Sequence, residues 1–189
     1  MTSELQISVE LPAWLAQINH QPPEVANEEA AMQLLLQIVQ RNVADGGGPF
    51  AAAVLDPQGR LLSIAANRVV QLHSSLWHAE MLALLLAQRR IAEHQLGAIG
   101  ACTLVSSCEP CAMCLGAIPF AGIRRLVCAA RGEDAEAIGF DEGCKPPDWQ
   151  AGLHSRGISI RTDLLREPAR QLLLDYREQG GVIYAAPSG

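Results

Sequence analysis

Two short segments of the chain carry side chains that can bind a metal ion and move protons. Residues 78–80 read HAE, and residues 108–114 read CEPCAMC, with two residues between successive cysteines. Zinc is bound in proteins by imidazole nitrogens and thiolates, and a catalytic zinc ion keeps one position open for water beside three protein ligands. His78 with one Cys-x-x-C pair would supply three ligands. Glu80 would then be a general base beside the water.

The three cysteines offer two pairs with the same spacing. Cys111 and Cys114 open a predicted helix, where free backbone N–H groups and the helix dipole favour thiolates. Cys108 and Cys111 form the other pair, with Pro110 between them. A redox pair, or one half of a structural zinc site, is an alternative interpretation. A structural site needs a fourth ligand close by, and the sequence has no second short Cys or His pair.

The composition is that of a globular protein with one full-sized core. The chain has 189 residues, of which 49% are hydrophobic and 18% charged. Its net charge is -6, and Lys145 is the only lysine, which argues against a nucleic-acid partner. No apolar run is long enough for a bilayer, and the N-terminus lacks the basic region of a signal peptide. These features predict a cytoplasmic protein that binds neither nucleic acid nor a membrane.

Helical and strand patterns alternate along the chain. Residues 1–26 are predicted to be an irregular lead with a short helix around Trp14, and residues 27–189 to form the domain. A helix is predicted at 28–44, a hairpin at 50–70, and a second helix with its N-cap at Ser74 or Ser75. Further strands are predicted at 101–107, 124–130 and 157–162, with a helix after the first of them and a last helix that Pro168 interrupts. This order predicts a three-layer α/β/α sandwich with a mixed five-stranded sheet.

The pattern H-x-E followed by P-C-x-x-C, each at the start of a helix, resembles the signature of the zinc-dependent nucleobase deaminases. The similarity to the cytidine and deoxycytidylate deaminase superfamily covers roughly residues 30–165. In this signature a proline directly precedes the first ligand cysteine. The resemblance therefore implies a Zn²⁺ ion bound by His78, Cys111 and Cys114, and it leaves Cys108 out. It also implies a sandwich of cytidine-deaminase type and a homodimer.

Within the superfamily the chain is similar to bacterial guanine deaminases, through SCEPCAMC, through AARGEDAEAIGFDEG at 129–143 and through a short tail with a late tyrosine. This similarity implies hydrolytic deamination of guanine to xanthine and ammonia. Zinc-bound hydroxide would attack C2, and Glu80 would be the proton shuttle. Glu142 would be a second acid that helps the amino group to leave, with Asp141 as the neighbouring alternative. A solvated acidic loop is the other interpretation of these two residues.

Three more residues are predicted to contact the base. Asn67 matches the family asparagine that bonds the base edge, Phe50 is placed to pack on the purine, and Tyr184 is placed to close the pocket from the tail. A turn role for Asn67 and a core role for Phe50 are the alternatives.

Other functions also fit the zinc motifs. A tRNA adenosine deaminase is disfavoured because the last helix mixes acidic and basic residues instead of forming a basic face. Ammeline or a related amino-purine or amino-triazine is an alternative substrate. A zinc-stabilised interaction domain is the least favoured, because it leaves Glu80 without a role.

Overall fold

The structure is a computed structural model, and it describes residues 9–184. Residues 1–8 of the predicted lead and residues 185–189 of the predicted tail lie outside the described residues. The helices and strands, in chain order, are α1 (Ala13–His20), α2 (Glu28–Ala44), β1 (Ala51–Leu55), β2 (Leu61–Ala66), α3 (Ala79–Ile91), the short 3₁₀ helix η1 (Leu96–Ile99), β3 (Thr103–Cys108), α4 (Ala112–Phe120), β4 (Arg125–Ala130), α5 (Gly132–Glu136), α6 (Trp149–His154), β5 (Ser159–Arg161) and α7 (Arg166–Glu178).

The five strands form one mixed sheet in the order β2-β1-β3-β4-β5. β1 pairs antiparallel with both β2 and β3, whereas β3, β4 and β5 are parallel. The antiparallel pair follows from the short turn at 56–59, and the parallel strands follow from the helical crossovers α4 and α6. The fold predicted from the order of the elements is confirmed.

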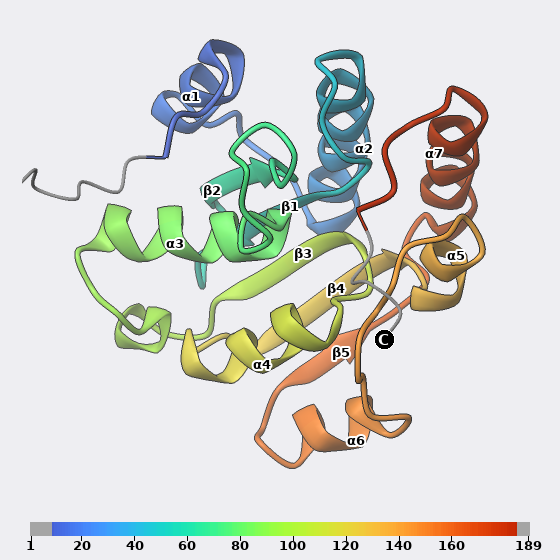
Figure 1. Cartoon of the computed structure of the whole chain (residues 1–189). Coiled ribbons are helices and arrows are strands. Elements are labelled where there is room, and N and C mark those ends of the chain that lie inside the picture. Colours follow the sequence, from blue (N-terminus) through green and yellow to red (C-terminus); the bar gives the residue numbers. More distant parts are fainter. Residues whose placement is uncertain (1–8, 185–189) are drawn as a thin grey trace, which may run out of the picture.

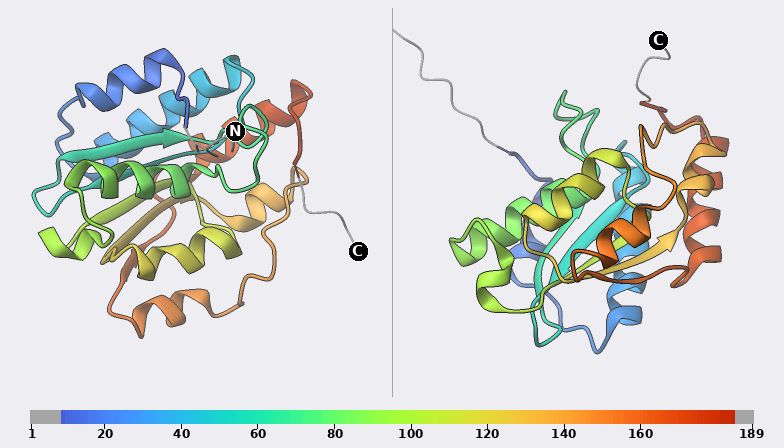
Figure 2. Two further views of the ribbon diagram at one scale, coloured as in Figure 1. Left: turned by 60° about the vertical axis from the view of Figure 1, so that its left-hand side comes forward. Right: turned by 90° about the horizontal axis from the view of Figure 1, so that it is seen from below.

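Helices cover both faces of the sheet (Figure 1). One core lies between the sheet and α1, α2, α5 and α7, and the other lies between the sheet and α3, α4 and α6 (Figure 2). β1 and β4 are buried on both faces, so they read as nearly continuous apolar runs rather than as alternating patterns, whereas the edge strand β5 is largely exposed. No helix within residues 9–184 has the length and hydrophobicity that crossing a bilayer requires.

Helix α1 covers the free edge of the sheet at β2. The Asn19 side chain donates to the carbonyl of Ile64 at 2.7 Å and accepts from the N–H of the same residue at 3.0 Å. The amide thus takes the place of a neighbouring strand at an edge that would otherwise present unpaired backbone groups. Leu15 of the same helix is fully buried. This part of the N-terminal lead is therefore packed into the fold.

The start of α3 differs from the predicted position. The helix begins at Ala79 rather than after Ser74 or Ser75, because residues 68–77 form a loop that is closed by a hydrogen bond from the Arg68 N–H to the Trp77 carbonyl. His78 therefore occupies the N-cap position of α3.

Two predictions about the C-terminal third of the chain are also corrected. Pro168 does not interrupt the last helix, since it lies in the first turn of α7, where a backbone N–H has no helical partner. The short helices α5 and α6 were not predicted, because segments of five and six residues carry too little periodicity.

Candidate active site

One end of the sheet gathers the predicted site residues. Ala51 of β1 pairs with Ala66 of β2, and Cys108 of β3 pairs with Ala130 of β4, so that the start of β1 and the ends of β2, β3 and β4 meet there. The helices α3 and α4 begin at the same end. This arrangement brings together residues from Phe50 to Tyr184, which are 134 positions apart in the sequence. A pocket forms there, lined by Phe50, Asn67, His78, Glu80, Glu109, Cys111, Phe140, Asp141, Glu142 and Tyr184.

The predicted ligands lie together at the N-termini of α3 and α4. Nδ1 of His78 lies 3.5 Å from Sγ of Cys111 and 3.6 Å from Sγ of Cys114, and the three ligand atoms all lie within 4.8 Å of one another. A tetrahedral zinc ion with ordinary Zn–S and Zn–N bonds places sulfur and nitrogen about 3.5 Å apart. A hydrogen bond from Cys114 lowers the pKa of Cys111 to about 4, so one thiolate forms readily. The residues fit a zinc ion, and one tetrahedral position remains for water.

Cys108 lies outside this group. Its side chain is buried in the core beneath α2 and α7, and its Sγ donates to the carbonyl of Arg131 at 3.5 Å. Burial raises the pKa of this thiol well above its ordinary value, which disfavours a thiolate. The third cysteine of the motif is a core residue in this structure.

Glu80 faces the ligands from the first turn of α3. Its carboxylate is buried, accepts a hydrogen bond from the Ser106 hydroxyl at 3.1 Å, and lies 3.6 Å from Sγ of Cys114. Burial raises the pKa of Glu80, and the hydrogen bond from Ser106 opposes this shift. A carboxyl group with a raised pKa, held beside a metal site, can both take up and release a proton.

Glu142 and Asp141 have different surroundings although they are neighbours. Asp141 is exposed, and its Oδ1 accepts from the N–H of Gly143 at 2.7 Å, which holds the loop in a tight turn. Glu142 is only 8% exposed and points into the pocket. Burial raises its pKa to about 7, against the opposing charge of Lys145. Of the two residues, Glu142 has the properties of an acid that exchanges protons near neutral pH.

Three buried polar atoms around the pocket have no hydrogen-bond partner within the described part of the chain: Nδ2 of Asn67, Oε2 of Glu142 and the Tyr184 hydroxyl. A buried polar group without a partner costs free energy, so these atoms are candidates to bind a ligand. Tyr184 reaches in from the segment after α7 and lies close to Gly48, where a Cβ would collide with its hydroxyl. With Tyr184 in place, the free volume is about 30 Å³. This volume is smaller than a nucleobase, so the residues that line the pocket must shift when a base binds.

The comparisons with known proteins agree with this geometry. The family model of the cytidine and deoxycytidylate deaminase zinc-binding region matches residues 25–130. The chain belongs to this deaminase family. The predictions of superfamily, zinc and a deaminase activity are confirmed by this match together with the relatives that follow.

Two solved structures and one curated protein are more specifically similar to this deaminase. A solved structure of a guanine deaminase from Nitrosomonas europaea is 48% identical, covers 92% of this chain and 97% of its own, and has a TM-score of 0.89. A second solved structure, of a variant in complex with 8-azaguanine, is 46% identical over 95% of this chain and 100% of its own, with a TM-score of 0.91. The guanine deaminase of Bacillus subtilis is 34% identical over 61% of this chain and 72% of its own length. Several tRNA-specific adenosine deaminases also match.

Sequence reasoning assigned no role to three residues at the deaminase pocket. Phe140 lies edge-on to Phe50 and to Tyr184, with ring centroids 5.0 Å apart in each pair. Glu109 also lines the pocket, and Ser106 binds Glu80 from the end of β3. Phe140 and Glu109 lie within the GFDEG and CEPCAMC segments, so their place in these motifs could have indicated that they line the pocket. For Ser106 no signal exists, since its contact with Glu80 depends on how α3 packs on β3.

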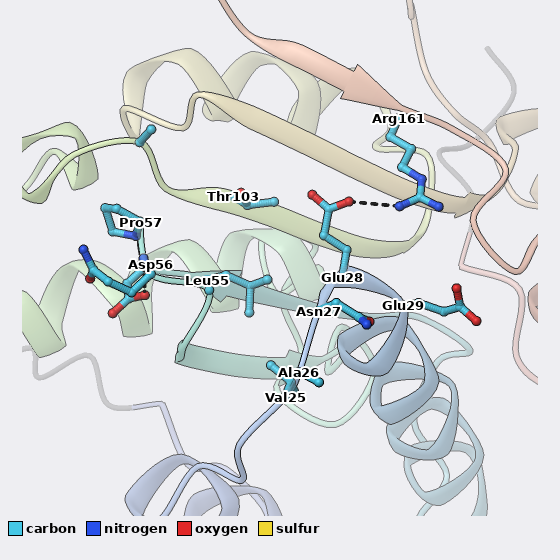
Figure 3. Close-up of a pocket in the computed structure, with 13 residues that line it drawn as sticks. Val25, Ala26, Asn27, Glu28, Glu29, Leu55, Asp56, Pro57, Thr103 and Arg161 are labelled. Atoms are coloured by element: carbon cyan, nitrogen blue, oxygen red, sulfur yellow. Dashed lines mark hydrogen bonds and ion pairs between the residues drawn. The ribbon is translucent and has the colours of Figure 1, made fainter.

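A larger hollow, of about 500 Å³, lies at the opposite end of β1 and β3 (Figure 3). Two of its carboxylates are already paired, Glu28 with Arg125 and Arg161, and Asp56 with Arg60. The Glu28 and Arg161 side chains point toward each other in Figure 3, at a distance of 3.1 Å. Among the described residues that line this hollow, none has a buried polar atom without a hydrogen-bond partner, in contrast to the deaminase pocket.

Proposed function

We propose that this protein is a guanine deaminase, which hydrolyses guanine to xanthine and ammonia. The observation that carries the proposal is the set of buried polar groups without a hydrogen-bond partner, a donor on Asn67 and an acidic group on Glu142, beside the His78, Cys111 and Cys114 ligand group. Guanine offers complementary groups, since it has acceptors at O6 and N7 and donors at N1 and the 2-amino group. The relatives named as guanine deaminases support the same activity.

His78, Cys111 and Cys114 would hold a zinc ion, which lowers the pKa of water and thereby supplies a nucleophile at neutral pH. Glu80 is the proton carrier in this proposal. It takes a proton from the attacking water and delivers it to ring N3 as the new C2–O bond forms. Ser106 donates to Oε1 of Glu80, and Oε2 lies 3.6 Å from Sγ of Cys114, on the side of the metal ligands.

Glu142 would complete the reaction at the amino group. For C2–N cleavage the leaving nitrogen must gain a proton while the C2 hydroxyl gives its proton to Glu80, so that the products are ammonia and xanthine. With a pKa of about 7, Glu142 holds a proton in a large share of molecules at neutral pH and can donate it. Its Oε2 has no hydrogen bond and lies 3.6 Å from the Lys145 ammonium, so Oε1 is left to contact the amino group. Asp141 has its carboxylate occupied by the turn at Gly143.

The remaining pocket residues would hold the base in place. The Asn67 amide would donate to the base edge, Phe50 would pack on the purine, and Tyr184 would cover it from the tail. Phe140 packs against the rings of Phe50 and Tyr184. This packing would keep the base and the reacting groups in a space that excludes water.

The activity is tested by incubating the zinc-loaded protein with guanine, ammeline, adenine, cytosine, cytidine and a tRNA anticodon arm, with ammonia release measured. Guanine should be deaminated with kcat/KM at least about a hundredfold above adenine and cytosine, because a polar site rejects bases that leave its groups unpaired. Ammeline is the second candidate substrate, since it also presents an amidine carbon with an amino group. Activity on the tRNA but not on guanine would refute the proposal.

We also propose that the protein forms a homodimer in the cytoplasm. Helix α4 has no charged residue, and its outer face is flanked by two apolar grooves that share Phe120, a side chain that is 81% exposed. Leu76, which is 55% exposed, lines one of these grooves. A contiguous apolar surface of this kind marks an interface, and a second copy of the chain offers the same complementary surface. The cytoplasmic location rests on the thiolate ligands, which need a reducing compartment.

A further inference from the structure

Lys145, the only lysine of the chain, lies almost buried behind Glu142. Its side chain is 11% exposed, and its ammonium group lies 3.2 Å from Oε2 of Glu109 and 3.6 Å from Oε2 of Glu142. The ammonium also lies 4.8 Å from the centre of the Trp149 ring. A buried lysine needs such partners, because an unpaired ammonium away from water loses its hydration without compensation. Two carboxylates and one aromatic ring therefore hold this charge in one place.

The partner Glu109 is itself held. Its Oε2 accepts from the N–H of Gly132 at 3.1 Å, at the start of α5. A Cβ on Gly132 would lie 3.2 Å from the Lys145 ammonium and 3.3 Å from Oε2 of Glu142, so the missing side chain leaves room for both groups. The position of Lys145 is thus determined by Glu109 directly after β3, by Gly132 at the start of α5 and by Trp149 at the start of α6.

We propose that Lys145 is a positioning residue for Glu142, an inference that rests on the proposed role of Glu142 as the second acid. The ammonium hydrogen-bonds to Glu109, and it attracts Glu142 across 3.6 Å without a hydrogen bond. Its contact with Oε2 therefore holds the carboxyl group in place, and Oε1 is the oxygen left for the leaving amino group. Lys145 is not among the residues that line the pocket, so it acts through Glu142 rather than on the base.

A purely structural role is the competing explanation. Lys145 would then only neutralise Glu109, and its removal would weaken the fold without a specific link to Glu142. A double-mutant cycle separates the two explanations, because residues that act through one another have non-additive effects.

The experiment compares wild type, Lys145→Met, Glu142→Gln and the double variant, each loaded with zinc and assayed by single-turnover xanthine formation. Methionine keeps the length of the side chain and removes the charge. Lys145→Met should lower the rate roughly tenfold to a hundredfold in the wild-type background, as expected for a misplaced reacting group, with KM for guanine changed less than about threefold. In the Glu142→Gln background the same substitution should change the rate less than about threefold.

Equal losses of rate in both backgrounds would overturn the proposal, as would a wild-type rate in Lys145→Met. Failure of the proposed function is a separate result, since wild type would then not convert guanine, or Glu142→Gln would be fully active. Arg125→Met is the matched control: it removes a cation from the partly buried carboxylate of Glu28 at the far end of the sheet. It should lower the melting temperature and leave the rate unchanged.

A measurement without substrate tests the contact itself. Because the chain has one lysine, labelling with ¹³Cε-lysine gives a single side-chain resonance. This resonance should shift in Glu142→Gln, since the neighbouring charge is lost. An unchanged resonance would contradict the contact on which the proposal stands.

Discussion

The side chain of Asn42 donates a hydrogen bond of 3.0 Å to the backbone carbonyl of Asn67, which lines the pocket. Asn42 is fully buried near the end of α2. Its amide also donates to the carbonyl of Gly48 at 2.8 Å and accepts from Arg68 at 2.9 Å. One side chain thus joins the segment before β1 to the segment after β2, and these two segments flank the pocket.

We predict that Asn42→Leu weakens both the fold and substrate binding. The change keeps the approximate volume and leaves two buried carbonyls and a guanidinium unpaired, which should cost about 2–4 kcal/mol in urea unfolding. KM for guanine should rise because the backbone of Asn67 is no longer held. Asn19→Leu is the matched control, since Asn19 also makes three hydrogen bonds, with Leu15 and Ile64, at the β2 edge. It should lower stability and leave KM unchanged, and equal KM values in the two variants would contradict the prediction.

The metal content should follow the predicted ligands. Cys111→Ala and Cys114→Ala should each lose zinc after purification and desalting, because two protein ligands are too few for a tight site. Cys108→Ala should keep about one zinc ion per chain, since its thiol lies in the core. Elemental analysis of the three variants checks this. A loss of zinc in Cys108→Ala alone would show that the ligand pair is wrong.

Glu80→Gln should separate catalysis from metal binding. Glutamine keeps the shape and the acceptor for Ser106 but cannot carry a proton. Turnover of guanine should fall roughly 10²–10⁴-fold, the usual range for a general acid–base group, and zinc should stay bound. Steady-state rates with zinc analysis of the same sample test this. Wild-type turnover in this variant would exclude Glu80 from the proton transfers.

The raised pKa of Glu142 predicts a pH-dependent cost to stability. The pKa of Glu142 is about 7 in the folded protein, against an ordinary value of 4.5. Between pH 4.5 and 7 the folded protein therefore keeps a proton on Glu142 that the unfolded chain has lost. Relative to Glu142→Gln, the free energy of unfolding of the wild type should be highest below pH 4.5. It should fall as the pH rises through 7, by an amount on the order of 1–3 kcal/mol. Urea unfolding of both zinc-loaded proteins from pH 5 to 8 measures the difference. A difference that does not change with pH would show that the pKa of Glu142 is not raised.

Asp141→Asn should lower the turnover of guanine less than Glu142→Gln does.

The apolar face of α4 predicts the behaviour of a surface variant. Phe120→Glu places a charge where two grooves meet, and it should convert a dimer into a monomer without changing the far-ultraviolet circular dichroism. Sedimentation velocity of wild type and variant measures the change. Wild-type protein that sediments as a monomer at micromolar concentration would contradict the proposed dimer.

The sequence by itself determined the chemistry and the class of fold. His78, Glu80 and the closely spaced cysteines predicted a zinc site with a general base, because residue types and short spacings are local properties. The resemblance to the deaminase signature then selected Cys111 and Cys114. The bounds of α2 and the two strands of the hairpin were also predictable, since their periodicity and turn residues are local. The order of these elements then restricted the fold to a sandwich around a mixed sheet.

Only the tertiary structure decided how the residues work together. Nothing in the sequence indicated that Ser106 holds Glu80, that Asn42 holds the backbone of Asn67, or that Lys145 stands between Glu109 and Glu142. Each of these pairs, apart from Lys145 and Glu142, is separated by more than twenty residues, and the contact exists because helices from both layers meet one end of the sheet. The same packing buries Glu142 and leaves Asp141 in water, which gives two adjacent acids different proton affinities. Burial depends on the whole fold, so residue types and spacing cannot specify it.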